Sequence, residues 1–134
     1  MQIPLARQKA LDDAFSLYIR LKYTGDNNYG VCCTCGRVKH FYELDCGHFQ
    51  PRRHYPTRWD EMNCHIQCHY CNRRMKGRMF EFGQYIDRVY GRDTSDRLYT
   101  KSRKGQSPSK SDVEEMITYY RAEVRKLKKT KHAS

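Results

Sequence analysis

The sequence is poor in the residues from which a large hydrophobic core is built. Only 38% of its 134 residues are hydrophobic, whereas 31% are charged. A chain of this length is typical of one domain. A domain with a small core often needs additional stabilisation, for example from a bound metal ion. We therefore expect a single domain over residues 1–134 whose stability depends on more than apolar burial.

Long apolar runs are absent as well. No stretch approaches the roughly 20 apolar residues that a membrane-spanning helix needs. The opening residues, MQIPLAR, lack the apolar segment of a signal peptide. This pattern predicts a soluble, cytoplasmic protein without a membrane partner. In that reducing compartment, seven cysteines indicate metal binding rather than disulfides.

Acidic residues are outnumbered. The chain has 26 Lys and Arg against 15 Asp and Glu, which gives a formal net charge of +11. Such an excess creates a field that attracts polyanions, and nucleic acid is the commonest polyanion in a cell. The alternative is a basic protein whose charge serves only solubility or attraction to an anionic membrane. The charge therefore favours nucleic acid as the partner.

Helical spacing marks the first part of the chain. Leu11, Phe15 and Tyr18 recur at steps of three and four residues, which predicts a helix over residues 5–23. A turn-rich segment, residues 24–28, follows it. The apolar stripe of this helix is expected to pack into the core.

The last part of the chain, residues 78–130, is predicted to hold further helices and a basic tail. One helix fits residues 78–90, because apolar residues share one face and a glycine follows. Residues 101–110 contain glycine and proline and are predicted to form a mobile loop. The final helix is expected to open with a capping box at Ser111–Glu114.

Between these helical parts, residues 30–77 contain all seven cysteines. Two pairs have a two-residue spacing, Cys32-x-x-Cys35 and Cys68-x-x-Cys71. This spacing lets two thiolates of one tight turn point at the same ion, and two such turns complete a tetrahedral shell. A closed shell of four sulfurs predicts a structural zinc ion, whose binding energy becomes folding energy.

Three cysteines are left outside this predicted site. Cys33 could replace Cys32, but Cys33-x-Cys35 would be a poorer chelating pair. Cys46 and Cys64 are expected to be small buried residues, because free cysteine is among the most buried residue types.

The segment between and after the cysteine pairs carries a second pattern. Its groups are Asp45-x-Gly47-His48-Phe49, Arg58-Trp59-Asp60-x-x-Asn63 and Gln67-Cys68-x-x-Cys71-Asn72, with Gly77 shortly after. Together with Cys32-x-x-Cys35-Gly36, these groups resemble the HNH endonucleases, and most closely the NinG/Rap recombination endonucleases of lambdoid phages. The resemblance extends from about residue 10 to residue 129. It implies an α+β HNH (ββα-metal, His-Me finger) core on a four-cysteine zinc site, flanked by N- and C-terminal helices, and location in the host cytoplasm.

Phosphodiester hydrolysis needs residues of these types. A water must become nucleophilic near pH 7, and a Lewis acid must act on the phosphate. His48 is the expected general base, because an ordinary histidine pKa of about 6.5 leaves it largely neutral at that pH. Asp45 and Asn72 offer the hard oxygen ligands that suit Mg²⁺ or Mn²⁺. The resemblance implies that Asn72 occupies a metal-ligand position and that Asn63 orients the base through backbone hydrogen bonds.

The chain departs from the HNH pattern in one respect. Many HNH enzymes have an acidic ligand directly before the catalytic histidine, whereas this chain has Gly47 there and its acid, Asp45, three residues before His48. A structural or salt-bridge role is therefore the alternative for Asp45. His65 matches a histidine that is frequent in NinG-like proteins and is a further candidate ligand, with simple packing as its alternative.

Basic residues gather on both sides of the predicted metal. They are Arg52, Arg53 and Arg58 after the catalytic histidine, and Arg73, Arg74, Lys76 and Arg78 after the second cysteine pair. We expect them to bind phosphates. Phosphate contacts position a substrate without reading its sequence. A solvated basic face is the alternative. Nothing resembles a base-reading helix, so cutting is predicted to be structure-selective or nonspecific.

The NinG/Rap resemblance implies branched DNA substrates such as Holliday junctions and D-loops. Resolving a four-way junction takes cuts in two strands, so a homodimer with two active sites is the expected assembly. Two alternatives stay open at this point. One is a noncatalytic zinc DNA-binding protein or recombination mediator, and the other is an HNH nuclease that cuts duplex DNA.

Overall fold

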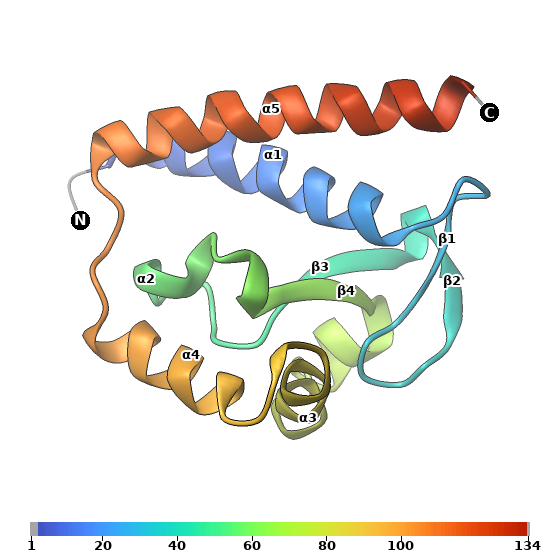
Figure 1. The fold of residues 1–134 in the computed structure, drawn as a ribbon, viewed down its shortest axis with the longest axis horizontal. Coiled ribbons are helices and arrows are strands. Elements are labelled where there is room, and N and C mark those ends of the chain that lie inside the picture. Colours follow the sequence, from blue (N-terminus) through green and yellow to red (C-terminus); the bar gives the residue numbers. More distant parts are fainter. Residues whose placement is uncertain (1–2, 134) are drawn as a thin grey trace.

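The computed structural model describes residues 3–133 and has a mixed α+β architecture (Figure 1). Helices α1 (Leu5–Tyr23) and α5 (Lys110–Ala133) pack side by side along one side of the molecule. Helices α3 (Met79–Tyr90) and α4 (Thr94–Lys104) lie on the opposite side, and strands β3 and β4 lie between these two layers. The strands form two separate antiparallel pairs.

The remaining elements are short. Strand β1 (Tyr29–Val31) pairs with β2 (Val38–His40), and β3 (Leu44–His48) pairs with β4 (Cys64–Cys68). The short helical segments are η1 (Phe41–Glu43), α2 (Tyr55–Arg58), η2 (Glu61–Asn63) and η3 (Tyr70–Arg74). The β3–β4 pair is therefore closed by a long connection and followed directly by a helical turn.

Two helices agree closely with the apolar spacing. Helix α1 has the bounds that the sequence predicts, and its buried side chains include Leu11, Phe15 and Tyr18. Helix α3 begins one residue later than predicted. The reason is that Arg78 adopts a left-handed backbone conformation, with φ of 44°, and so precedes the helix instead of starting it.

The mobile loop predicted over residues 101–110 was wrong in its first part. Residues 101–104 belong to α4, which buries Leu98 and Ser102 on one face. Only Leu98 among these is a large apolar residue, so the inward face of α4 does not produce the apolar periodicity by which helices are recognised in a sequence.

The N-terminus of α5 also differs from the prediction. The residues that cap it are Ser109 and Asp112 rather than Ser111 and Glu114. The Asp112 backbone N–H donates to Ser109 Oγ at 3.0 Å, and the Ser109 N–H donates to Asp112 Oδ2 at 2.9 Å. Glu114 instead accepts two hydrogen bonds from Arg7 on α1. The predicted capping box is therefore shifted by two residues.

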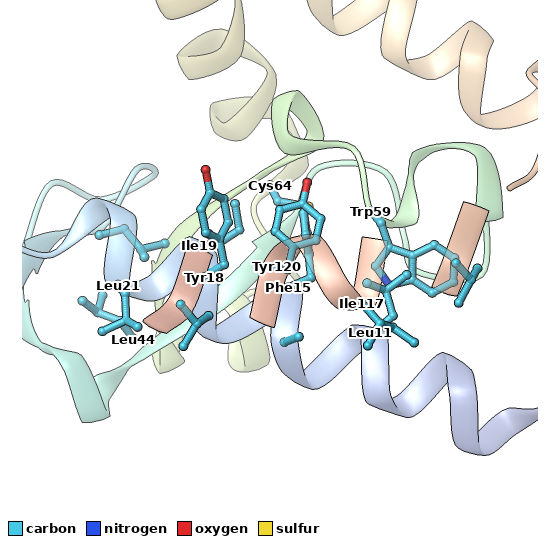
Figure 2. Close-up of a cluster of buried hydrophobic side chains, with 14 of the residues drawn as sticks. Leu11, Phe15, Tyr18, Ile19, Leu21, Leu44, Trp59, Cys64, Ile117 and Tyr120 are labelled. Atoms are coloured by element: carbon cyan, nitrogen blue, oxygen red, sulfur yellow. The ribbon is translucent and has the colours of Figure 1, made fainter. Parts of the chain in front are cut away.

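The main core fills the space between α1, α5 and one face of the β3–β4 pair (Figure 2). The Phe15 ring meets the Tyr120 ring edge-on, with centroids 5.0 Å apart. Full burial of one large apolar side chain stabilises a fold by about 1.5–3 kcal/mol. Members of this core include Leu11, Phe15, Ile19, Leu44, Trp59, Ile66, Ile117 and Tyr120.

A smaller cluster lies on the other side of the strand pair. Phe49, Phe82, Ile86 and Leu98 bring the loop after β3 against α3 and α4. Both layers of helices therefore hold the segment that follows His48. Within residues 3–133, none of the helices is both long and apolar enough to cross a membrane.

Candidate functional site

Four cysteines come together at one end of the β3–β4 pair. Cys32 and Cys35 lie between β1 and β2, Cys68 ends β4, and Cys71 lies in η3. Their Sγ atoms are all within 4.8 Å of one another, and those of Cys35 and Cys68 are 3.8 Å apart. With Zn–S bonds of about 2.3 Å, the sulfurs of a tetrahedral site are about 3.8 Å apart. The four cysteines selected by their spacing could therefore hold a zinc ion.

The local backbone explains how the thiols converge. Gly36 has a left-handed φ of 77° and closes the first turn, with its N–H donating to the carbonyl of Cys32 at 2.9 Å. The Cys71 N–H donates to Cys68 Sγ at 3.5 Å, and Arg78 Nε donates to Cys71 Sγ at 3.2 Å. Donors aimed at sulfur stabilise the thiolate, which is the form that binds metal.

The four neighbouring thiols affect one another's ionisation. Burial acts to raise the pKa of Cys32, but hydrogen bonds from Thr34 and nearby backbone amides outweigh it and lower this pKa to about 6. Burial and the adjacent thiols raise the pKa of Cys35 to about 12. Four thiolates this close repel one another, so all of them ionise together only beside a cation.

The strand pair separates the predicted catalytic residues by face. In the register of β3 and β4, His48 lies opposite Cys64. Side chains alternate along a strand, so His48 and Leu44 share the face toward α1, whereas Asp45 lies on the other face. The structure therefore places Asp45 and His48 on opposite faces of β3, not side by side.

One ring nitrogen of His48 is engaged by the backbone. Nε2 lies 2.8 Å from the carbonyl oxygen of Arg58, and since a carbonyl only accepts, Nε2 carries the proton and Nδ1 holds the lone pair. Burial lowers the pKa of His48 to about 4, against the effect of this carbonyl. The imidazole is therefore neutral at pH 7, with its Nδ1 able to accept a proton.

His48 and Asn72 line the same cleft, which also contacts Arg52 and Lys76. Its volume is about 270 Å³, and a water occupies about 30 Å³ in the liquid. The cleft therefore has room for a phosphate group together with several waters.

Asn72 links this cleft to Asp45. Its Nδ2 donates to Asp45 Oδ2 at 3.0 Å, and its side-chain oxygen has no hydrogen-bond partner among residues 3–133. Asp45 also accepts from Arg73 Nε at 3.0 Å and Nη2 at 2.9 Å, and His69 Nε2 lies 3.4 Å from it. The Asp45 carboxylate is thus surrounded by donors, while the Asn72 oxygen remains available.

Gly47 has no room for a side chain, because the space beside it is filled from across the strand pair. A Cβ atom on Gly47 would lie 2.1 Å from Oε1 of Gln67. The amide of Gln67, fully buried, donates to Thr34 Oγ1 at 3.1 Å and to the Gly77 carbonyl at 2.9 Å. Gln67 was present in the sequence motif, but its role in joining the cysteine turn to the cleft was not predicted.

Asn63 fixes the loop that follows β3. It is fully buried, and its Oδ1 accepts from the Gln50 N–H at 2.8 Å. Its Nδ2 donates to the carbonyls of Gln50 at 3.1 Å and Thr57 at 3.0 Å. The side chain therefore ties together the two ends of the loop that carries Arg58, the hydrogen-bond partner of His48.

His65 lies on the face of the strand pair that does not carry His48. Its Nε2 is 2.8 Å from the Tyr85 hydroxyl, and its ring lies against Tyr23 with centroids 3.8 Å apart. Burial lowers its pKa to about 4. No other cysteine, histidine or carboxylate of residues 3–133 forms a metal-binding group with it. This environment favours the packing alternative for His65.

The basic residues of the two predicted clusters fall into distinct groups. Arg58 donates to Asp12 from Nε at 3.1 Å and Nη2 at 2.5 Å, and its side chain is only 12% exposed. Arg52 also pairs with Asp12, at 2.6 Å, but is 58% exposed. Arg58 is therefore part of the fold, whereas Arg52 remains accessible to a substrate.

The cluster after the second cysteine pair is similarly divided. Arg78 donates to Cys71 Sγ, and Arg73, which is 62% exposed, pairs with Asp45. Arg53, Arg74 and Lys76 are exposed and form no ion pair within residues 3–133. These three cations are the ones most available to phosphates, and Lys76 also lines the cleft.

A second group of metal-ligand side chains was not predicted from the sequence. One ring nitrogen of His48 and the sulfurs of Cys46 and Cys64 lie within 4.8 Å of one another. The sequence offers no C-x-x-C signal for this group, because the pairing of β3 with β4 brings its members together.

The family model described as "Bacteriophage Lambda NinG protein" matches residues 6–131. No curated protein and no solved structure matches the chain.

Proposed function

The chain belongs to the NinG family of bacteriophage lambda proteins, and we propose that it is a metal-dependent endonuclease that cuts branched DNA intermediates of recombination. The observation that carries the proposal is the shared cleft of His48 and Asn72 beside exposed cations. The order strand, strand, helical turn over β3, β4 and η3 agrees with the ββα-metal architecture that the HNH resemblance implies.

In this proposal His48 is the general base. Its Nε2–H donates to the Arg58 carbonyl, so Nδ1 can take a proton from a water in the cleft. A carbonyl that accepts from the ring also stabilises the imidazolium that forms. The pKa of about 4 describes the protein without substrate. A phosphate anion in the cleft raises this pKa, because a nearby negative charge favours the protonated ring.

Asn72 would provide the protein oxygen for Mg²⁺ or Mn²⁺. Its amide NH₂ donates to Asp45, and within residues 3–133 its side-chain oxygen stays without a hydrogen-bond partner in a residue that lines the cleft. When bound, the ion would polarise the phosphate and stabilise charge on the leaving oxygen. Asp45 would position Asn72 rather than bind the ion, since Arg73 and Asn72 already occupy its oxygens. Few protein ligands suit Mg²⁺, which keeps several of its waters.

A structural zinc ion on the four cysteines would hold this arrangement together. Cys71 directly precedes Asn72, and Gln67 connects the first cysteine turn to Gly77 beside the cleft. Binding of the ion would therefore fix both walls of the site. The energy of zinc binding would add to the modest core described above.

Exposed Arg53, Arg74 and Lys76 would hold the DNA backbone on either side of the cleft, with Arg52 and Arg73 able to join them. Phosphate contacts of this kind suit a protein that selects DNA by shape. Two active sites are needed to resolve a four-way junction, so we also propose that the active form is a homodimer. Sedimentation with and without a junction would test the assembly.

The test uses a labelled four-way junction, a matched linear duplex and Mg²⁺. We expect the wild-type protein to cut the junction in preference to the duplex. His48→Ala should keep the zinc ion of the four-cysteine cluster and the affinity for the junction but lose cleavage, whereas the control His40→Ala, in β2 and outside the cleft, should cut normally. Binding without cleavage by the wild-type protein would favour the mediator alternative. Equal cutting of junction and duplex would remove the preference for branched DNA.

A further inference from the structure

The face of the strand pair that carries His48 also carries two thiols. Cys46 precedes His48 by two residues on β3, and Cys64 lies opposite His48 on β4. Side chains at these positions point to the same face. The two sulfurs and one ring nitrogen all lie within 4.8 Å of one another, so small side-chain shifts would bring them to the roughly 3.5–3.8 Å between ligands of a tetrahedral zinc ion.

The chemistry of this group suits a soft divalent ion. Two thiolates and one neutral imidazole around Zn²⁺ have no net charge, which lowers the cost of burying the ion. Ligating histidines commonly donate their other ring N–H to a backbone carbonyl, and His48 already does so with Arg58. Three protein ligands leave a fourth position for water, as in zinc sites with two cysteines and one histidine.

An ion has a route to these ligands. Cys64 is buried, but Cys46 and His48 line the cleft that holds Asn72 and also a second cleft beside Asp12 on α1. The group is therefore open to solvent on the side of Cys46 and His48.

We propose that Cys46, His48 and Cys64 form a second zinc-binding site, and that zinc bound there blocks catalysis by occupying the lone pair of His48. The site is separate from the four-cysteine cluster. It should bind more weakly than that cluster, because it offers three protein ligands instead of four. The inhibitory part rests on the proposed function of His48, whereas the binding part does not.

The binding test uses the full chain loaded with one equivalent of Zn²⁺, titrated with Co²⁺ and followed by thiolate-to-cobalt charge-transfer absorption. We expect the wild-type protein to bind one further ion, with an absorption that corresponds to two thiolates. Cys46→Ser should lose this ion while keeping the first equivalent of zinc, which reports that the fold is intact. Cys33→Ser, a half-buried thiol outside both groups, should keep both ions.

The activity test adds Zn²⁺ to junction-cutting reactions that contain Mg²⁺. Wild-type cleavage should be lost, and Cys46→Ser should resist this loss compared with its own rate without added zinc. A wild-type protein that binds only one ion, or a Cys46→Ser variant that still binds the second, would overturn the proposal. Zinc inhibition that persists in Cys46→Ser would overturn its inhibitory part. If the wild-type protein binds the second ion but does not cut DNA, the proposed function is refuted and the second zinc site is still supported.

Discussion

Asn63 allows the sharpest prediction about the loop between β3 and β4. Asn63→Ala removes one acceptor and two donor contacts, all made to the backbone of a single loop. A typical hydrogen bond contributes about 0.5–1.5 kcal/mol, and a buried polar group left without a partner costs about 1–3 kcal/mol. Some of the released groups will recruit water, so we expect the free energy of unfolding to fall by about 3–5 kcal/mol.

The effect should reach catalysis through Arg58. The loop held by Asn63 contains Thr57, whose carbonyl is one of its acceptors, and the next carbonyl belongs to Arg58, the partner of His48. Loosening this loop removes the group that fixes the tautomer of His48. Folded Asn63→Ala protein should therefore cut DNA more slowly than the wild-type protein while retaining zinc.

Urea unfolding at a fixed zinc concentration, followed by circular dichroism, measures the stability change. Asn27→Ala is the matched control, because Asn27 is exposed and accepts a single hydrogen bond from the Tyr29 N–H. That control should change stability by less than about 0.5 kcal/mol. A decrease of less than about 1 kcal/mol in the free energy of unfolding of Asn63→Ala would refute the reasoning, because the loss of three buried hydrogen bonds should have a larger effect.

Four further substitutions probe other parts of the molecule. Cys68→Ala should lose zinc and cooperative folding, measured by metal content and circular dichroism, because a closed site loses one of its four ligands. Wild-type stability should fall as the pH drops from about 6.5 toward 4, because the unfolded chain takes up a proton at an ordinary histidine pKa while burial holds the pKa of His65 to about 4. His65→Gln should reduce this dependence in acid-range urea titrations. Arg58→Ala should cost about 1–3 kcal/mol by leaving Asp12 without its buried partner, whereas Arg74→Ala should weaken junction binding and lower its salt slope by about 1.

For three of these substitutions, a specific outcome would contradict the prediction. A folded, zinc-bound Cys68→Ala protein would show that the four-cysteine assignment is wrong. A pH profile unchanged by His65→Gln would remove the link to that ring. Loss of junction affinity without loss of stability in Arg58→Ala would mean that Arg58 contacts DNA despite its pairing with Asp12.

The sequence predicts well the features that depend on local spacing. Helix α1 and the four-cysteine cluster follow from a three-to-four-residue apolar period and two C-x-x-C pairs, both of which are set by nearby residues. Helix α4 was missed because Leu98 is the single large apolar residue that it buries. The capping box of α5 was predicted two residues too late, because Ser109 and Ser111 are both suitable capping residues when only the sequence is considered.

Features that depend on strand pairing could not be predicted in the same way. The sequence places Asp45 near His48, but the two-residue period of β3 puts them on opposite faces. The two donors from Arg73 to Asp45 are contacts between side chains on different elements, which no sequence pattern specified. Cys64 is buried, as expected, whereas Cys46 is only half-buried and lines the cleft, and the approach of both to His48 depends on the register of two strands.

The register of β3 and β4 has a consequence for how the protein folds. The connection from Phe49 to Asn63 is too long to set the alignment of β3 and β4 by turn geometry, and a slip of one position would exchange the two faces of a strand. His48 would then turn away from its carbonyl partner and Asp45 would enter the apolar interior. Cys68, opposite Leu44 at the far end, is also a predicted metal ligand. Metal binding by the four cysteines would therefore stabilise only the strand pair that has the native register.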